Sequence, residues 1–202
     1  ALLCSLHQMD FNNKNQGNYM LTVTAAIVSH ERPKKLKNMV YQIENQTEPF
    51  DVIKLYVSGY EPEELSWCKY PVSFQPDRRD WGHEKRSIAM NECTTDYILC
   101  ASDDDIYLYH FLQKMKEKAE ETKADIIYCN FRTQGRANSQ PYIDAQPIYR
   151  SITNGCMLVK SDLIKRVPYT YREYAADGRW VDEAIKAGAT TAKVDECLFF
   201  HY

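Results

Sequence analysis

The chain has 202 residues, 44% of them hydrophobic and 26% charged, which is the composition of a globular protein and excludes a fibrous or disordered one. Its 25 lysines and arginines against 28 aspartates and glutamates leave a net charge of −3, so overall charge gives no attraction to nucleic acid or an anionic membrane. No apolar run approaches the ~20 residues of a membrane-spanning helix, and the short apolar start lacks the basic flank of a signal peptide, so we expect neither segment.

Residues 1–19 show no apolar period after the first few positions and are predicted to be an N-terminal arm, followed by one domain at residues 20–202. From Leu21 onward, short apolar runs typical of buried strands alternate with segments whose apolar side chains recur at helical spacing. Strands are predicted at 21–28, 52–57, 72–74, 97–101, 125–131 and 155–159, and helices at about 36–43, 83–93, 108–120, 161–166 and 178–186.

Strands separated by helices predict an α/β domain with a mostly parallel sheet flanked by helices. Ser161 is predicted to cap the helix that it opens, and Gly188 to end the last helix. Residues 132–148 contain glycine, proline and few periodic apolar positions, so they are predicted to be a long loop, which in a compact domain is often a functional lid.

The seven cysteines are scattered, with no C-x-x-C pair and no spacing typical of a zinc site. Most lie beside aliphatic residues, as Cys100 and Cys129 do, and we interpret them as small core residues. A reduced, cytoplasmic compartment is the simplest location for such a chain.

Three adjacent carboxylates, Asp103 to Asp105, follow the buried strand at 97–101. Ligands of open α/β sheets bind outside the carboxyl ends of the strands, and a divalent cation such as manganese or magnesium would relieve the repulsion between the acids. The residues alone leave open a second interpretation, an acidic turn in which one aspartate caps the next helix.

Four segments in this order resemble the family-2 type nucleotide-sugar glycosyltransferases, which have the GT-A fold. The resemblance covers about residues 21–202. The segments are Thr24–Pro33, similar to the opening strand and nucleotide turn; Asp80–Ser87, similar to the helix start near the donor; Tyr97–Asp105, similar to the aspartate motif; and Ala176–Gly188, similar to the catalytic acidic helix start. Each segment alone is a weak signal, whereas their order and spacing are fairly specific.

The resemblance implies a Rossmann-like GT-A domain that carries out a metal-dependent, inverting transfer, in the hexosyltransferase class. The donor would be a nucleoside-diphosphate sugar, with UDP expected, and the acceptor a hydroxyl group. Asp105 would be the direct metal ligand, Asp103 would lie near the ribose or the ion, and His201 would complete the metal site. From the residues alone, a histidine after an apolar strand is more often incidental.

Asp177 is the candidate general base, because an inverting transfer needs a carboxylate that takes the proton of the attacking hydroxyl. The alternative is that Asp177 caps the helix at 178–186. Asp182 and Glu183 compete for the catalytic role, but their positions inside the helix suit a solvated face better.

The remaining candidates are predicted to contact substrate. Arg32 and Arg86 are placed by the motifs near phosphate, which arginine pairs with, and Trp180 could form a wall for the sugar or acceptor. In relatives the second strand commonly ends in an aspartate that reads uracil, whereas this chain has Ser58. The full set of predicted substrate contacts is Ser29, His30, Arg32, Ser58, Arg86, Asp103, Asp104 and Trp180.

Two other classes compete with a glycosyltransferase. A nucleotidyltransferase should carry a glycine-rich phosphate loop, and residues 29–33 contain no glycine. A non-catalytic nucleotide-sugar-binding module would keep the fold without transfer. The acceptor is unknown; Arg132, Arg136 and Arg150 flank the long loop and motivate an anionic acceptor such as a nucleic acid or a phosphorylated glycan.

Overall fold

The computed structural model describes residues 20–134 and 141–202, so the predicted arm at 1–19 and Arg136 lie outside the described residues. The strands are β1 (Val23–His30), β2 (Val52–Ser58), β3 (Val72–Phe74), β4 (Tyr97–Ser102), β5 (Ile106–Tyr107), β6 (Ile126–Thr133), β7 (Tyr142–Ile143), β8 (Met157–Lys160) and β9 (Thr191–His201). The α-helices are α1 (Pro33–Glu44), α2 (His83–Asn91), α3 (Phe111–Thr122), α4 (Ser161–Arg166) and α5 (Ala176–Lys186), and short 3₁₀ turns lie at η1 (Pro62–Leu65) and η2 (Asn154–Cys156).

The strands form one sheet in the order β3-β2-β1-β4-β8-β6-β9-β5, with β7 added beside β6. The pairings of β1 with β2 and β4, of β2 with β3 and of β6 with β9 are parallel, and β8 runs antiparallel between β4 and β6. Strands β1, β2, β3, β4, β6 and β9 therefore point the same way, and their carboxyl ends meet at one edge. The predicted mostly parallel sheet is confirmed.

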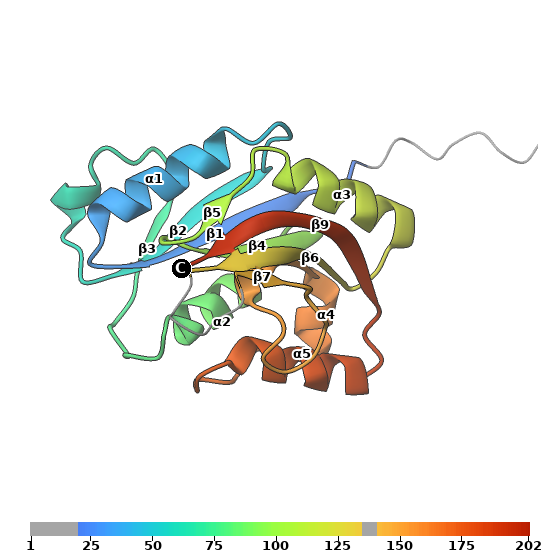
Figure 1. The fold of residues 1–202 in the computed structure, drawn as a ribbon. Helices are drawn as coiled ribbons and strands as arrows, with labels where there is room; N and C mark the ends of the chain where they lie inside the picture. Colours follow the sequence, from blue (N-terminus) through green and yellow to red (C-terminus); the bar gives the residue numbers. More distant parts are fainter. Residues whose placement is uncertain (1–19, 135–140) are drawn as a thin grey trace, which may run out of the picture.

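The helices cover both faces of the sheet, with α1 and α3 on one side and α2, α4 and α5 on the other (Figure 1). Leu36 and Met39 of α1 and Leu112 of α3 are wholly buried against one face. Trp180 and Val181 of α5 are equally buried on the other side. The 3.6-residue apolar spacing of these helices thus determines which side of each helix packs on the sheet.

Most predicted elements are confirmed, with shifted ends. The strand at 72–74 and the helix at 161–166 have the predicted bounds, and Pro33 begins α1, where its missing N–H costs no hydrogen bond. Gly188 has a φ of +87° just after α5, as a helix-ending glycine should. The six cysteines among the described residues are free, and Cys100, Cys129 and Cys156 are buried as expected.

Three predictions were wrong in part. The long loop is interrupted, because β6 continues to Thr133 and β7 pairs with it. Ser161 is the first residue of α4 rather than its cap, and its hydroxyl donates to the Thr95 carbonyl at 2.5 Å. Helix α3 begins at Phe111, since residues 106–107 form β5 against β9 and the Leu108 N–H bonds the Leu198 carbonyl.

Candidate active site

The predicted site residues meet at the carboxyl edge of the sheet. Ser29 and His30 end β1, Ser58 ends β2, Asp103 follows β4 and His201 ends β9. The antiparallel strand β8 brings its amino end, with Asn154 just before it, to the same edge. Residues far apart in the sequence therefore become neighbours because their strands are parallel, which is where open α/β sheets place their ligand sites.

The turn after β1 is joined to the aspartates by hydroxyl groups. The Ser29 hydroxyl lies 2.5 Å from Asp103 Oδ2 and 2.5 Å from the hydroxyl of Tyr60. The His30 Nδ1 lies 3.0 Å from the Ser58 hydroxyl, which places the ends of β1 and β2 in direct contact. Ser29, His30 and Ser58 thus form a polar floor at the ends of β1 and β2, and their contact with substrate stays a prediction.

Arg32 lies between two of the three aspartates. Its Nη2 is 2.5 Å from Asp103 Oδ1, and its Nη1 donates to Asp104 Oδ2 at 2.5 Å. Burial by itself lowers the pKa of Arg32, but the two carboxylates outweigh it and the pKa is raised. Burial also raises the pKa of Asp103, against the opposing effects of Ser29 and Arg32. Arg32 is held by this double ion pair, and its contact with phosphate stays a prediction.

Asp105 points away from Arg32 and pairs with His201, whose Nδ1 lies 3.0 Å from Asp105 Oδ1. Burial raises the pKa of Asp105 and exceeds the effect of the His201 hydrogen bond. Burial lowers the pKa of His201, but the hydrogen bond and charge of Asp105 exceed it and raise the pKa. Both raised pKa values favour a proton bound between Asp105 and His201.

The predicted metal ligands are only partly brought together. Asp105 and His201 are adjacent, whereas Asp103 is turned to Ser29 and Arg32. Within residues 20–134 and 141–202, no group of three or more His, Cys, Asp or Glu side chains could hold a metal ion. The Asp105 carboxylate and the His201 imidazole remain as two adjacent protein ligands. This number suits an ion that takes its other ligands from substrate phosphates and water.

Arg86 lies beneath this edge and not on its open surface. Its Nη1 donates to the Trp81 carbonyl at 2.6 Å, and its Nη2 donates to the Ser102 hydroxyl at 2.6 Å. The side chain is buried, and its Nε has no partner among the described residues. Arg86 therefore supports the end of β4 just before the aspartates, where sequence reasoning had expected a phosphate contact.

Asp177 is the second residue of α5, two positions after the N-cap residue Ala175, so it is not the helix cap that the sequence also allowed. Its Oδ1 accepts from the Gly178 N–H at 2.9 Å and its Oδ2 from the Asn154 N–H at 3.2 Å. Ala175, which precedes the helix, has a φ of +58°, a strained conformation for a residue other than glycine. Two backbone donors and a strained turn therefore fix the orientation of this carboxylate.

Trp180 does not line the site. The ring is wholly buried, and its Nε1 donates to the Val167 carbonyl at 2.9 Å. The predicted contact with sugar or acceptor is thus corrected: Trp180 is a core residue that anchors α5. Trp81 is the exposed tryptophan at this edge, packed edge-on against Tyr174 at 6.4 Å between ring centres.

Sequence reasoning missed Asn154 and Tyr169 and did not single out His83. Asn154 precedes a glycine and a buried strand, a signal for a turn at the ligand edge that could have been used. Tyr169 lies in an irregular segment with no period to mark it. Its buried hydroxyl nevertheless contacts both His83 and Asn154.

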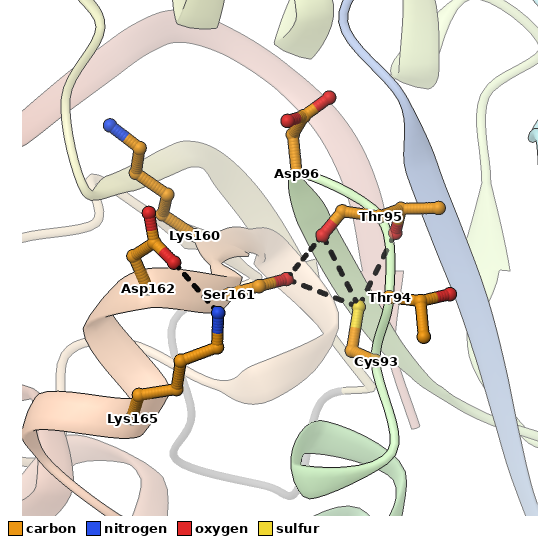
Figure 2. A pocket seen from close by; sticks show the side chains of 8 residues that line it. All are labelled: Cys93, Thr94, Thr95, Asp96, Lys160, Ser161, Asp162 and Lys165. Carbon is orange, nitrogen blue, oxygen red and sulfur yellow. Dashed lines mark hydrogen bonds and ion pairs between the residues drawn. The ribbon is translucent and has the colours of Figure 1, made fainter.

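A pocket of about 460 Å³ lies at the opposite edge of the sheet. It is lined by Cys93, Thr94, Thr95, Asp96, Lys160, Ser161, Asp162 and Lys165, from the segment before β4 and the end of the antiparallel β8 (Figure 2). Lys165 is paired with Asp162, and the Ser161 hydroxyl is bound by Thr95. These groups satisfy one another and lie away from the aspartates, so we assign the chemistry to the carboxyl edge and not to this pocket.

The fold is that of the GT-A class of glycosyltransferases, and the family comparison agrees. The sequence model of Glycosyl transferase family 2 matches residues 24–157, which is more than half of the chain, so the protein belongs to that family. No curated protein matches it by sequence. In the part of the chain that the structure describes, no helix is long and apolar enough to cross a membrane.

Among solved structures, the chain is similar to TarS of S. aureus. Residues 1–349 of TarS superpose with a TM-score of 0.68 at 11% identity, over 90% of this chain and 60% of that one. A TarS structure in complex with UDP gives 0.67 at 10% identity, over 89% and 60%. One in complex with UDP-GlcNAc gives 0.66 at 11% identity, over 89% and 58%. This chain thus spans less than two thirds of the chains it resembles, and the likeness establishes the fold.

Proposed function

We propose that the protein transfers a hexose from a nucleoside-diphosphate sugar to an acceptor hydroxyl, with inversion at the anomeric carbon and with the help of a divalent cation. The observation that carries this proposal is the meeting of the Asp105–His201 pair and Asp177 at one sheet edge, next to the polar floor of Ser29, His30 and Ser58. Family membership supports the reaction class. UDP as the nucleotide is supported by the UDP and UDP-GlcNAc complexes of TarS.

Asp105 and His201 are the residues that would hold a manganese or magnesium ion. Their donor set, one carboxylate and one imidazole, suits an ion completed by the donor diphosphate. Gly155 fits this role, because a Cβ there would lie 2.9 Å from Asp105 Oδ2 and crowd the carboxylate. A bound ion would neutralise the charge that develops on the departing nucleoside diphosphate.

The remaining residues would bind and orient the donor and activate the acceptor. The His30–Ser58 contact would meet the nucleotide base, in place of an aspartate. Asp103 and Asp104 would face the ribose and the phosphates, with Arg32 releasing one or both carboxylates or turning to phosphate. Asp177, held in place by two N–H groups, would accept the proton of the attacking hydroxyl.

The acceptor would bind over the loops that precede α2 and α5. Exposed Trp81 and Tyr174 lie there, and the guanidinium of Arg150 lies 5.1 Å from the ring centre of Tyr149. Aromatic and arginine side chains together suit a glycan, with an anionic one or a nucleic acid as the alternatives. A cytoplasmic location is part of the proposal, supported by the six free cysteines of the described residues.

A thermal-shift panel of nucleotide sugars tests the donor and the metal together. We expect one nucleoside-diphosphate sugar to raise the melting temperature with manganese or magnesium and not with a chelator; ligand at 100 Kd adds about 2.7 kcal/mol. Asp105→Asn should remove the metal-dependent shift. Asp162→Asn, an exposed aspartate on α4, is the matched control and should keep it.

Two outcomes would contradict the proposal. If the nucleotide sugar raises the melting temperature equally in the presence of a chelator, and Asp105→Asn does not change this, the protein does not need a metal ion to bind the donor. If no nucleotide sugar of the panel raises the melting temperature, the proposed donor is wrong. The product then separates the other classes: release of nucleoside diphosphate supports a glycosyltransferase, pyrophosphate a nucleotidyltransferase, and neither product a binding module.

A further inference from the structure

A chain of buried polar side chains runs from α2 to Asp177. His83 Nδ1 lies 2.8 Å from the Tyr169 hydroxyl, which also accepts from Asn154 Nδ2 at 3.1 Å. The backbone N–H of Asn154 in turn donates to Asp177 Oδ2 at 3.2 Å. Tyr169 is 1% exposed, Asn154 3% and His83 5%, so water does not compete with these contacts. The chain thus joins α2, the segment before α5 and the η2 turn to one carboxylate.

The hydrogen-bond roles in this chain follow from the available protons. Burial, with the nearby charge of Arg86, lowers the pKa of His83 to about 4, so its imidazole is neutral at pH 7. The Tyr169 oxygen already accepts from Asn154, and its single proton can be donated to His83 Nδ1. His83 then carries its proton on Nε2, and every contact has one donor and one acceptor.

The side-chain oxygen of Asn154 has no hydrogen bond in this arrangement of the described residues. Its Oδ1 is buried with no partner among the described residues, a state that destabilises the folded protein. Native structures rarely leave such a group without a reason. Rotating the amide toward another partner would release Tyr169, which holds the side chain through Nδ2. The residue with this unpaired oxygen, Asn154, is thus also the one whose main-chain N–H contacts Asp177.

The same turn contacts the other half of the site. Gly155 lies against Asp105, since an added Cβ would meet Asp105 Oδ2 at 2.9 Å, and its carbonyl accepts from the Tyr107 hydroxyl at 3.0 Å. A shift of residues 154–155 would therefore change the position of both Asp177 and Asp105. The turn is thus a shared support, and His83 and Tyr169 hold it from one side.

We propose that His83, Tyr169 and Asn154 are positioning residues that hold the Asn154 N–H against Asp177, so that its carboxylate stays oriented for proton transfer. This inference rests on the proposed role of Asp177 as general base. The titratable groups whose charge acts together with that of Asp177 are His83 on α2, Cys156 on η2, Tyr169 before α5 and His201 on β9.

Tyr169→Phe tests the inference by removing one hydroxyl group. We expect the amide of Asn154 to exchange its hydrogen faster, measured by NMR on ¹⁵N-labelled protein. With the donor found by thermal shift, kcat for transfer or donor hydrolysis should fall roughly tenfold, because the Asn154 N–H is held less firmly against Asp177, while KM for the donor stays unchanged.

Tyr97→Phe is the matched control, because the Tyr97 hydroxyl is equally buried and donates to the Ala124 carbonyl at 2.6 Å, at the other edge of the sheet. It should lower stability without changing Asn154 exchange or kcat. Asn154→Ala keeps the N–H and removes its tether, so it should reproduce the Tyr169→Phe changes, and it serves if that variant does not fold.

The positioning role is overturned if both variants leave Asn154 exchange and kcat as in the control. Failure of the proposed function gives a different pattern. Asn154 exchange would still quicken in Tyr169→Phe, whereas Asp177→Asn would retain full transfer.

Discussion

Asp177 has carboxylate oxygens bound by two different segments, the first turn of α5 and the η2 turn. A capping aspartate would bond only the N–H groups of its own helix, whereas the Asn154 contact ties this side chain to the aspartate edge. Asp182 lies in the same helix, and its Oδ1 accepts from the Tyr149 N–H at 3.1 Å. Both aspartates therefore accept a backbone hydrogen bond from a segment outside their helix. Asp177 is bound by the η2 turn beside Asp105, whereas Asp182 is bound by Tyr149.

Asp177→Asn is expected to lower transfer by about 10²–10⁴-fold, since the amide cannot accept the proton. Metal-dependent donor binding should change less than twofold, because the side chain keeps its shape. Both are measured by nucleoside diphosphate release and by calorimetric titration with donor. Asp182→Asn should retain transfer, and loss of donor binding in Asp177→Asn would show that the residue belongs to the donor site.

At the scale of the element, α5 is docked through a glycine. Gly178 lies against the segment before β8, where an added Cβ would be 2.9 Å from the Arg150 N and 3.0 Å from the Tyr149 Cα. Backbone atoms cannot move aside as a flexible side chain can. The close approach therefore sets the position of the helix that carries Asp177.

Gly178→Ala is expected to lower the free energy of unfolding by about 1–3 kcal/mol, the usual cost of overpacking. Helix propensity alone predicts the opposite sign, a gain of about 1 kcal/mol. Urea unfolding distinguishes the two. Arg179→Ala, next in the helix and half-exposed, should change stability by less than about 0.5 kcal/mol. An increase in stability for Gly178→Ala would contradict this account of the docking.

At the scale of the whole molecule, α2, α4 and α5 form the layer on one side of the sheet (Figure 1). His83 of α2 is buried, and among the described residues its side chain makes its hydrogen-bond contact with the neutral Tyr169 hydroxyl. Burial is the largest cause of the lowered pKa of His83, about 4 against an ordinary 6.5. The folded protein therefore binds this proton less readily than the unfolded chain does. Stability from this group is complete above pH 6.5 and is lost as the pH falls toward 4.

Lowering the pH from 7 to 4 should therefore cost the wild type about 3 kcal/mol of unfolding free energy through His83, since each unit of pKa difference corresponds to about 1.4 kcal/mol. Urea unfolding across this range measures it. His83→Gln cannot take up the proton, so its stability should fall less over the same window. Parallel curves for the two proteins would contradict the assignment.

Apolar spacing predicted the elements well where a strand or helix buries one continuous side. It failed where pairing alone makes a strand: β5 and β7 have two residues each, and half of β9 is polar. Such strands exist because a neighbouring strand offers hydrogen bonds, and that information lies elsewhere in the chain. The irregular register between β6 and β9 around Asn130 likewise depends on the pairing of two strands that are distant in the sequence.

The sequence by itself determined the order of the main helices and strands and the α/β class, and it supplied the candidate site residues, since the aspartates and Asp177 lie in its motifs and His201 follows its last apolar run. Only the tertiary structure decided which oxygen meets which partner: Arg32 joined Asp103 to Asp104, His201 took Asp105, and Trp180 entered the core. The physical reason is that parallel strands bring distant residues to one edge, where burial and charge select the pairs, and neither is readable from local order along the chain.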